Sequence, residues 1–337
     1  MHLRHLDMYK KIRTGVIGVG SMGQNHARIY NEVSNLIGVA DPNEKQGRLI
    51  AERFDVEWFS DYNEMLEKVD AVTVAVPTVL HREVSENVAK KGVHLLVEKP
   101  LAGNVKDSKA IINASNSNSV VLSVGHVERH NPVIEYTKKA IDSGKWGDII
   151  SISSRRVSRY PERIKDVGVV FDLGIHDLDI LRYLSGGEVT QLFALGGSLE
   201  YKNIEDHASV MLGFDNGIKS FCEVSWLTPM KVRQTFLTCT KAYIIMDYMD
   251  QTVNILSSKY ENIDQGNLFD TETSVKNKKA EVLNGEPLKN EILDFLKSIV
   301  SNQEGKKFEP LVTGKDGLEA VILAEKVLKS LKSGNIQ

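Results

Sequence analysis

The sequence is poor in cysteine, lacks a long apolar run and has no excess of one charge. Its 337 residues include only Cys222 and Cys239, too few for a disulfide framework or a thiolate cage around a metal ion. No apolar stretch approaches the roughly 18 residues of a membrane-spanning helix, and residues 1–13 lack the apolar core of a signal peptide. Lys and Arg total 42 against 45 Asp and Glu, and the net charge of -3 argues against a general binder of nucleic acid or membrane. These absences predict a soluble, cytoplasmic protein.

Two different strand patterns divide the chain. Up to residue 126, short and almost wholly apolar segments alternate with helical patterns, which is typical of parallel strands covered on both faces. The later strands alternate apolar and polar residues, and residues 257–286 are polar and predict a surface excursion. We therefore predict an α/β fold with a Rossmann-type, doubly wound parallel sheet over 1–128. An α+β domain with a large open, mainly antiparallel sheet is expected over 129–337, with a C-terminal helix that is free to pack back on the first domain.

The stretch from residue 18 to residue 23, here named the glycine turn, carries the pattern G-x-G-x-x-G at Gly18, Gly20 and Gly23. It follows an apolar strand and opens a helix, and Asp41 ends the second strand at the distance typical of a dinucleotide-binding unit. Asp41 suits an adenosine ribose and repels a 2′-phosphate, which favours NAD over NADP, although Arg48 nearby leaves NADP open. The remaining expected cofactor contacts are Ser21 and Met22 in the turn, and Pro77, Thr78, His81, Glu98 and Lys99 at later strand ends.

Three motifs identify the chain as similar to the Gfo/Idh/MocA oxidoreductases, a family that includes glucose–fructose oxidoreductase and inositol dehydrogenase. They are the glycine turn, Glu98-Lys99-Pro100 and the segment from Asp172 to Asp177, which contains His176. The resemblance covers nearly the whole chain. It implies a Rossmann domain followed by an α+β domain, an NAD-dependent dehydrogenase activity on a CH–OH group, and Lys99, His176 and Asp172 as the catalytic residues.

The chemistry of an alcohol oxidation explains why these residue types are suitable. Imidazole titrates near neutrality, so His176 suits the transfer of the hydroxyl proton. Lys99 either stabilises the developing alkoxide as an ammonium or takes the proton itself, and the sequence leaves open which residue is the base. Asp172 and His176 are four residues apart on one face of a helix expected over 172–184, although helix capping is an alternative role for Asp172. No third ligand has suitable spacing, so no metal is expected.

Residues 155–165, here named the basic segment, precede the expected catalytic helix. We expect its arginines to bind a diphosphate, because a guanidinium group donates paired hydrogen bonds to phosphate oxygens. The alternative is a solvated loop in which the charges are paired with one another. A second polar stretch lies where the chain enters the second domain and is also expected to contact substrate. Interdomain ion pairing or helix capping is the alternative role of its residues. The residues expected to contact substrate are Lys99, Glu128, Arg129, Asn131, Arg155, Arg156, Arg159, Arg163, Asp172 and His176.

The polar stretch near residue 128 and the segment from Asp172 to Asp177 are more similar to family members that act on nucleotide sugars than to inositol dehydrogenases. The resemblance implies oxidation of C3 of UDP-N-acetylglucosamine to a ketone for amino-sugar or glycan biosynthesis. An inositol or free-monosaccharide dehydrogenase is the first alternative, and a non-catalytic NAD(H)-sensing regulator is the second. The apolar alternation over 207–247 predicts a homodimer or homotetramer that covers the open sheet face.

Overall fold

The computed structural model describes residues 8–161, 167–201, 204–260, 273–306 and 308–337. The chain divides into two compact units, the first comprising residues 1–130 and 286–322 and the second comprising residues 131–285 and 323–337. The division lies close to the expected boundary at 128. Residues 286–322, which the sequence analysis places in the second domain, belong to the first unit, and they contain one complete helix and the beginning of the C-terminal helix.

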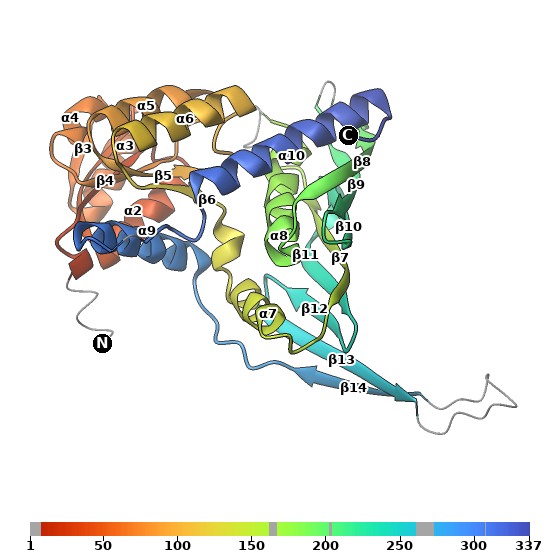
Figure 1. Ribbon diagram of the computed structural model, residues 1–337. Coiled ribbons are helices and arrows are strands. Elements are labelled where there is room, and N and C mark those ends of the chain that lie inside the picture. Colours follow the sequence, from red (N-terminus) through yellow and green to blue (C-terminus); the bar gives the residue numbers. More distant parts are fainter. Residues whose placement is uncertain (1–7, 162–166, 202–203, 261–272, 307) are drawn as a thin grey trace, which may run out of the picture. The chain divides into compact units, whose positions relative to one another are not determined.

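The first unit contains a six-stranded, wholly parallel sheet in the order β3-β2-β1-β4-β5-β6 (Figure 1). The strands are β1 (Arg13–Ile17), β2 (Asn35–Ala40), β3 (Glu57–Phe59), β4 (Ala71–Val74), β5 (His94–Glu98) and β6 (Leu122–Gly125). The helices are α2 (Gly23–Val33), α3 (Glu44–Phe54), α4 (Tyr62–Leu66), α5 (His81–Lys90), α6 (Val105–Ser117) and α9 (Pro287–Gln303). This order confirms the prediction of a Rossmann-type sheet.

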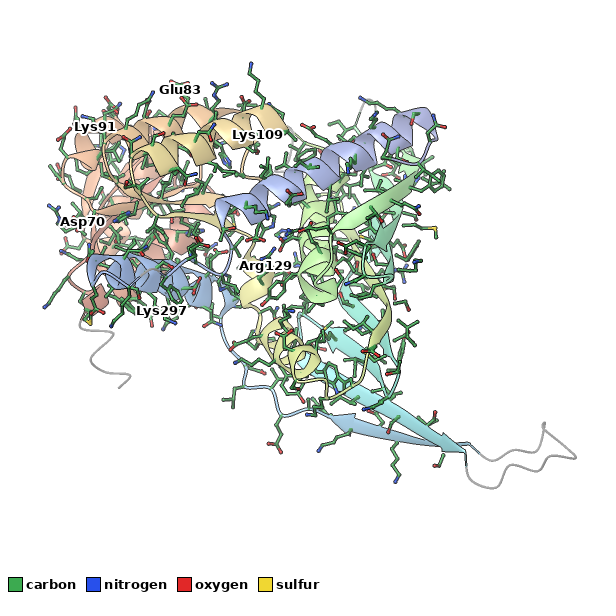
Figure 2. All side chains as sticks on the ribbon, in the orientation of Figure 1. Asp70, Glu83, Lys91, Lys109, Arg129 and Lys297 are labelled. Atoms are coloured by element: carbon green, nitrogen blue, oxygen red, sulfur yellow. The ribbon has the colours of Figure 1, made fainter. Side chains whose placement is uncertain are left out.

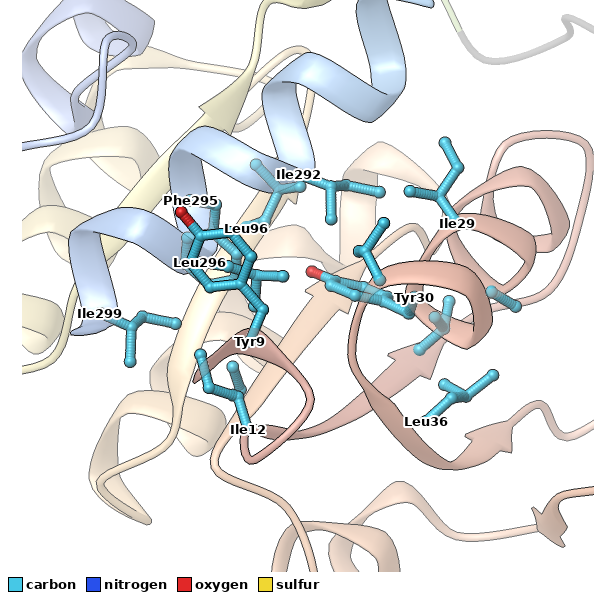
Figure 3. Close-up of a cluster of buried hydrophobic side chains, with 14 of the residues drawn as sticks. Tyr9, Ile12, Ile29, Tyr30, Leu36, Leu96, Ile292, Phe295, Leu296 and Ile299 are labelled. Atoms are coloured by element: carbon cyan, nitrogen blue, oxygen red, sulfur yellow. The ribbon is translucent and has the colours of Figure 1, made fainter. Parts of the chain in front are cut away.

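Two apolar clusters cover the two faces of this sheet, as its continuously apolar strands require. One contains side chains of α2, α3 and α9, and Figure 3 shows Ile292, Phe295 and Leu296 of α9 in it together with Tyr30 of α2. The other contains side chains of α4, α5 and α6. The helix α9, which lies far from α2 in the sequence, is therefore part of the core of the first unit.

The second unit contains an eight-stranded sheet in the order β14-β13-β12-β11-β7-β10-β9-β8, in which only the pair β7 and β10 is parallel. Its strands are β7 (Ile149–Arg159), β8 (Val189–Gly197), β9 (His207–Phe214), β10 (Lys219–Ser225), β11 (Leu227–Cys239), β12 (Tyr243–Asp247), β13 (Thr252–Tyr260) and β14 (Thr273–Lys279). Its helices are α7 (Pro132–Asp142), α8 (Ile175–Ser185) and the end of α10 (Gly314–Ser333). The mainly antiparallel sheet confirms the predicted fold class, whereas β13 and β14 occupy part of the region expected to be a surface excursion.

The two faces of the second sheet differ in composition. Buried residues such as Val210, Cys222 and Leu237 form its inner face, and both cysteines are buried free thiols, as predicted. On the outer face, strand register aligns a row that is mostly apolar: Phe193, Met211, Phe221, Ser153, Phe236 and Ile245. Met211 is 60% exposed and Phe221 is 42% exposed in the single chain. Among the described helices, none is long and apolar enough to cross a bilayer.

Candidate active site

The glycine turn connects β1 to α2 and leaves room for a dinucleotide. Gly18 has a φ of 85°, and a Cβ there would lie 2.6 Å from the backbone oxygen of Ala75. A Cβ on Gly23 would lie 1.8 Å from the oxygen of Gly18, so the helix packs on the turn only without one. A Cβ on Gly20 would meet nothing within 4 Å. The turn is therefore tight at its two ends and open at Gly20, which fits the approach of a pyrophosphate to the helix N-terminus.

Asp41 is held beside the glycine turn at the end of β2. Its carboxylate accepts hydrogen bonds from the backbone N–H of Val19 and of Asn43, each at 2.9 Å. Its backbone oxygen accepts the indole N–H of Trp58. Arg48, which left NADP open in the sequence, lies over the Trp58 ring at 4.4 Å from its centroid. The part-exposed carboxylate at this position suits a ribose hydroxyl pair, as NAD requires.

The ring of His81 is hydrogen-bonded to two loops that follow strand ends. Its Nδ1 lies 2.9 Å from the oxygen of Pro100, and its Nε2 lies 3.0 Å from the oxygen of Val76. Burial lowers the pKa of His81, so the neutral ring donates to one of these carbonyls at a time. His81 is 1% exposed, whereas Pro77 is exposed and Thr78 is half-buried. These contacts assign His81 to support of the loops, and the cofactor contacts predicted for the other two residues stay predictions.

Lys99 follows directly after β5, and the side chain of Glu98 supports its peptide unit. One oxygen of the buried Glu98 accepts the backbone N–H of Lys99 at 3.1 Å, and the other lies 2.9 Å from Nε2 of His26. Lys99 itself is half-buried. The sequence analysis did not select His26, although its place three residues after Gly23, on the helix that follows the turn, was a usable signal.

Asp172 and His176 lie on consecutive turns in the second unit. The predicted single helix is instead a π-helical turn, Val170–Gly174, followed by α8. Asp172 is 5% exposed and accepts the indole N–H of Trp226 at 3.3 Å, while His176 is half-buried. The residues that precede the two segments, Val169 and Gly174, form no side-chain cap, and Glu205 accepts the backbone N–H of Val170 at 3.3 Å, so the capping alternative for Asp172 finds no support. A π-helical turn is a frequent feature of functional sites.

The basic segment does not form one patch, because neighbouring residues of a strand point to opposite faces. Arg156 is buried and pairs with Asp177, and its guanidinium lies over the Tyr248 ring at 5.3 Å. Arg155 lies on the outer face and pairs with Glu223 at 3.0 Å. The prediction that both contact one substrate is therefore not supported by their placement. Arg163 lies outside the described residues.

A cavity of about 480 Å³ in the second unit is bordered by one arginine of the basic segment and by aromatic rings. The ring of Tyr160 stacks on Tyr201 at 3.9 Å and meets Trp226 edge-on at 5.1 Å. The lining residues are Arg159, Glu200, Tyr201, Trp226, Leu227, Thr228 and Pro229. One residue of this lining, Trp226, also donates a hydrogen bond to Asp172, a predicted catalytic residue. Trp226 was not selected from the sequence, where it appears only as the last residue of a strand expected over 218–226.

The polar stretch that begins near residue 128 is buried. Arg129, labelled in Figure 2, pairs with Asp316 at 3.0 Å and donates to the backbone oxygen of Leu311. Asn131 is the N-cap of α7, and its amide donates to the oxygen of Tyr248. Glu128 is 5% exposed. Asn131 therefore takes the capping role, whereas Arg129 and Asp316 both belong to the first unit, so their pair is not the interdomain pair given as the alternative. Substrate contact by these residues stays a prediction.

No group of three or more His, Cys, Asp or Glu side chains suited to hold a metal ion occurs in the ranges that the structure describes.

Comparisons with known proteins agree with this geometry. The family model described as oxidoreductase family, NAD-binding Rossmann fold, matches residues 12–126, and that of the GFO/IDH/MocA C-terminal domain matches residues 134–245. The UDP-N-acetylglucosamine 3-dehydrogenase of Acidithiobacillus ferrooxidans is 31% identical over 72% of this chain and 76% of its own. Its solved structure has a TM-score of 0.85 at 27% identity, over 96% of this chain and 98% of that one. The scyllo-inositol 2-dehydrogenase (NAD(+)) of Bacillus subtilis is 31% identical over 76% of this chain and 80% of its own.

Proposed function

The chain belongs to the GFO/IDH/MocA family of NAD-binding oxidoreductases, and we propose that it oxidises a secondary hydroxyl of a nucleotide sugar in the cytoplasm. The specific substrate that we propose is UDP-N-acetylglucosamine, oxidised at C3 to the 3-keto sugar. The observation that carries the proposal is the position of Lys99 directly after β5, because ligands of a doubly wound sheet bind at the carboxyl ends of its strands.

In the proposed mechanism, the residues of this chain handle the hydroxyl proton and the charge on oxygen. NAD+, when bound, supplies the hydride acceptor. Either Lys99 or His176 accepts the hydroxyl proton, and the other donates a hydrogen bond to the reacting oxygen. Asp172, held by the indole N–H of Trp226, orients the sugar through its carboxylate.

The cavity beside Trp226 supports a substrate with a diphosphate. Arg159 contributes the cationic side chain of the cavity wall, and the ring of Tyr201 offers a flat apolar surface to a base or a sugar. With Arg155 and Arg156 paired elsewhere, Arg159 is the described arginine of the basic segment that fits a diphosphate.

The test is a substrate panel with NAD+, followed by NADH absorbance. It compares UDP-N-acetylglucosamine with free N-acetylglucosamine, myo-inositol and scyllo-inositol, and a transaminase removes the ketone product so that the equilibrium does not hide turnover. We expect kcat/KM for UDP-N-acetylglucosamine to exceed that for the free sugar by about a hundredfold, because charge-assisted hydrogen bonds to the diphosphate are lost with it. Turnover of an inositol with none of the nucleotide sugar would contradict the proposed substrate.

Oxidation of a free inositol or monosaccharide is the second candidate. Its support is the Bacillus subtilis relative, which is as similar in identity as the nucleotide-sugar enzyme. Glu200 also lines the cavity that contains Arg159, and its carboxylate would repel a diphosphate. The same substrate panel separates the two candidates.

We also propose that the outer face of the second sheet joins copies of the chain into a dimer or tetramer. The aligned row that includes Met211, Phe221 and Phe236 is apolar, and isolated soluble chains rarely leave such a row uncovered. Light scattering should give a dimer or tetramer mass for the wild type and a lower mass for Phe221→Asp. A monomeric wild type would contradict the proposal.

A further inference from the structure

A chain of buried hydrogen bonds leads from helix α2 to Lys99. The ring of His26 is fully buried, with Nε2 at 2.9 Å from Oε1 of Glu98 and Nδ1 at 3.1 Å from Oγ1 of Thr73. The hydroxyl of Thr73 donates to the phenolic oxygen of Tyr30 at 3.0 Å. On its other side, Oε2 of Glu98 accepts the backbone N–H of Lys99 at 3.1 Å. All five residues belong to the first unit.

The direction of these bonds fixes the role of each atom of the imidazole. A carboxylate only accepts hydrogen bonds, so Nε2 of His26 donates to Glu98. Nδ1 of His26 faces the hydroxyl oxygen of Thr73, whose own proton is directed to Tyr30. Burial by itself raises the pKa of Glu98, but the hydrogen bond and charge of His26, together with Lys99, bring it below its ordinary value. The pair is thus a carboxylate accepting hydrogen bonds from the imidazole and from the Lys99 peptide.

The neighbouring strand leaves space for this carboxylate. Gly125 of β6 is in register with Glu98, and a Cβ on it would lie 3.1 Å from Cα and 3.2 Å from Oε2 of Glu98. These separations are shorter than ordinary van der Waals contacts. The glycine therefore lets the carboxylate fold back over the peptide unit that precedes the Lys99 side chain.

We propose that His26, acting through Glu98, is a positioning residue for Lys99. The proposal rests on the proposed function, in which Lys99 acts on the substrate hydroxyl. Helix α2 begins at the end of the glycine turn, so His26 ties the helix at the dinucleotide site to the strand end that carries Lys99. Both oxygens of Glu98 have partners within the fold, which supports a role in holding Lys99, and the cofactor contact predicted for Glu98 from the sequence stays a prediction.

The first test compares His26→Leu with the wild type and separates kcat from cofactor binding. We expect kcat to fall by about tenfold or more, because small misplacements of a reacting group are costly, while the Kd for NADH stays within about twofold. NADH fluorescence measures the Kd. Val88→Ala is the control, since it opens a cavity in the same unit without touching the network. It should lower the melting temperature and leave kcat unchanged, and an equal loss of kcat in this control would overturn the proposal.

The second test uses two substitutions of Glu98. In Glu98→Gln the amide oxygen still accepts the Lys99 N–H, and the amide nitrogen donates to Nε2 of a neutral His26, so each hydrogen bond is kept. Glu98→Ala removes all of them. We expect kcat of Glu98→Gln to exceed that of Glu98→Ala by about tenfold. Equal kcat in the two variants would overturn the positioning role.

A readout without substrate separates this proposal from the proposed function. Hydrogen exchange at the Lys99 amide should be faster in His26→Leu and Glu98→Ala than in the wild type and Glu98→Gln, because the amide loses its held acceptor. Unchanged exchange in all variants would overturn the proposal even if the enzyme is active. Faster exchange in an enzyme that oxidises none of the tested sugars would support the network and reject the proposed function alone.

Discussion

The glycine turn over residues 18–23 and the basic segment over residues 155–165 each concentrate one residue type in a short stretch of sequence. In the glycine turn, residues five apart meet directly, and Gly23 packs against Gly18. In the basic segment, Arg155 and Arg156 are neighbours in sequence but pair with carboxylates on opposite faces of one sheet. A turn brings sequence neighbours to one place, whereas a strand separates them, so only the first kind of cluster is reliable evidence for a site.

The largest effect on kcat is expected for a substitution of Lys99, which follows β5 in the sheet that also carries the glycine turn. Lys99→Ala should lower kcat by about 10²–10⁴-fold, since it removes either the base or the group that stabilises the oxygen charge. Lys109→Ala, an exposed lysine labelled in Figure 2, is the matched control and should leave kcat unchanged. NADH absorbance measures both variants. Nearly full turnover in Lys99→Ala would show that Lys99 is not catalytic.

The two adjacent arginines give the most direct test of the separation in the basic segment. Arg156→Ala leaves Asp177 buried without this partner, which should cost about 3–5 kcal/mol of unfolding free energy. Arg155→Ala breaks an exposed pair with Glu223 and should cost less than about 1 kcal/mol. Urea unfolding measures both. Equal losses would mean that the two side chains do not differ in their surroundings.

The next prediction concerns Glu291, a buried carboxyl group on α9, the helix that contacts α2 after the glycine turn. It is fully buried, and its carboxyl oxygens have no hydrogen-bond partner among the described residues. Burial raises the pKa of Glu291 well above its ordinary 4.5, and the charges of Glu98 and Asp294 raise it further. As pH rises above 4.5, the unfolded chain releases this proton while the folded chain keeps it, so stability falls.

Glu291→Gln removes this titration. The variant should be more stable than the wild type by about 1–3 kcal/mol at about pH 7, and the difference should shrink toward zero as pH falls to 4.5. Urea unfolding across this pH range measures it. Glu83→Gln, at an exposed position, is the control and should show no such trend. A difference that grows toward low pH would contradict the assigned direction.

The smallest effect is expected at Arg159, the arginine of the basic segment that lines the cavity. Arg159→Ala should raise KM for the UDP-sugar by about tenfold, the value of one charge-assisted hydrogen bond, and leave kcat nearly constant. Lys219→Ala, an exposed change on β10, should leave KM unaltered. An unchanged KM in Arg159→Ala would remove the diphosphate argument.

Local signals predicted the elements of the first unit well. The helix α3 starts directly after the cap Asn43, and both its periodicity and its cap are encoded by adjacent residues. The strand β3 has only three residues and was not predicted. The strands β13 and β14 were not predicted either, since strands near a sheet edge carry polar residues and lack the alternation of a buried face.

The sequence by itself determined the glycine turn, the position of Asp41 after the second strand, the position of Lys99 after β5, and the spacing of Asp172 and His176. These features depend on residues near one another in the chain, where turn geometry and helix periodicity act directly. Only the tertiary structure decided that Arg156 and Arg129 are paired inside the fold, that Trp226 holds Asp172, and that His26 holds Glu98. The physical reason is that the partner of a buried polar group comes from a distant part of the chain, and its identity follows from packing.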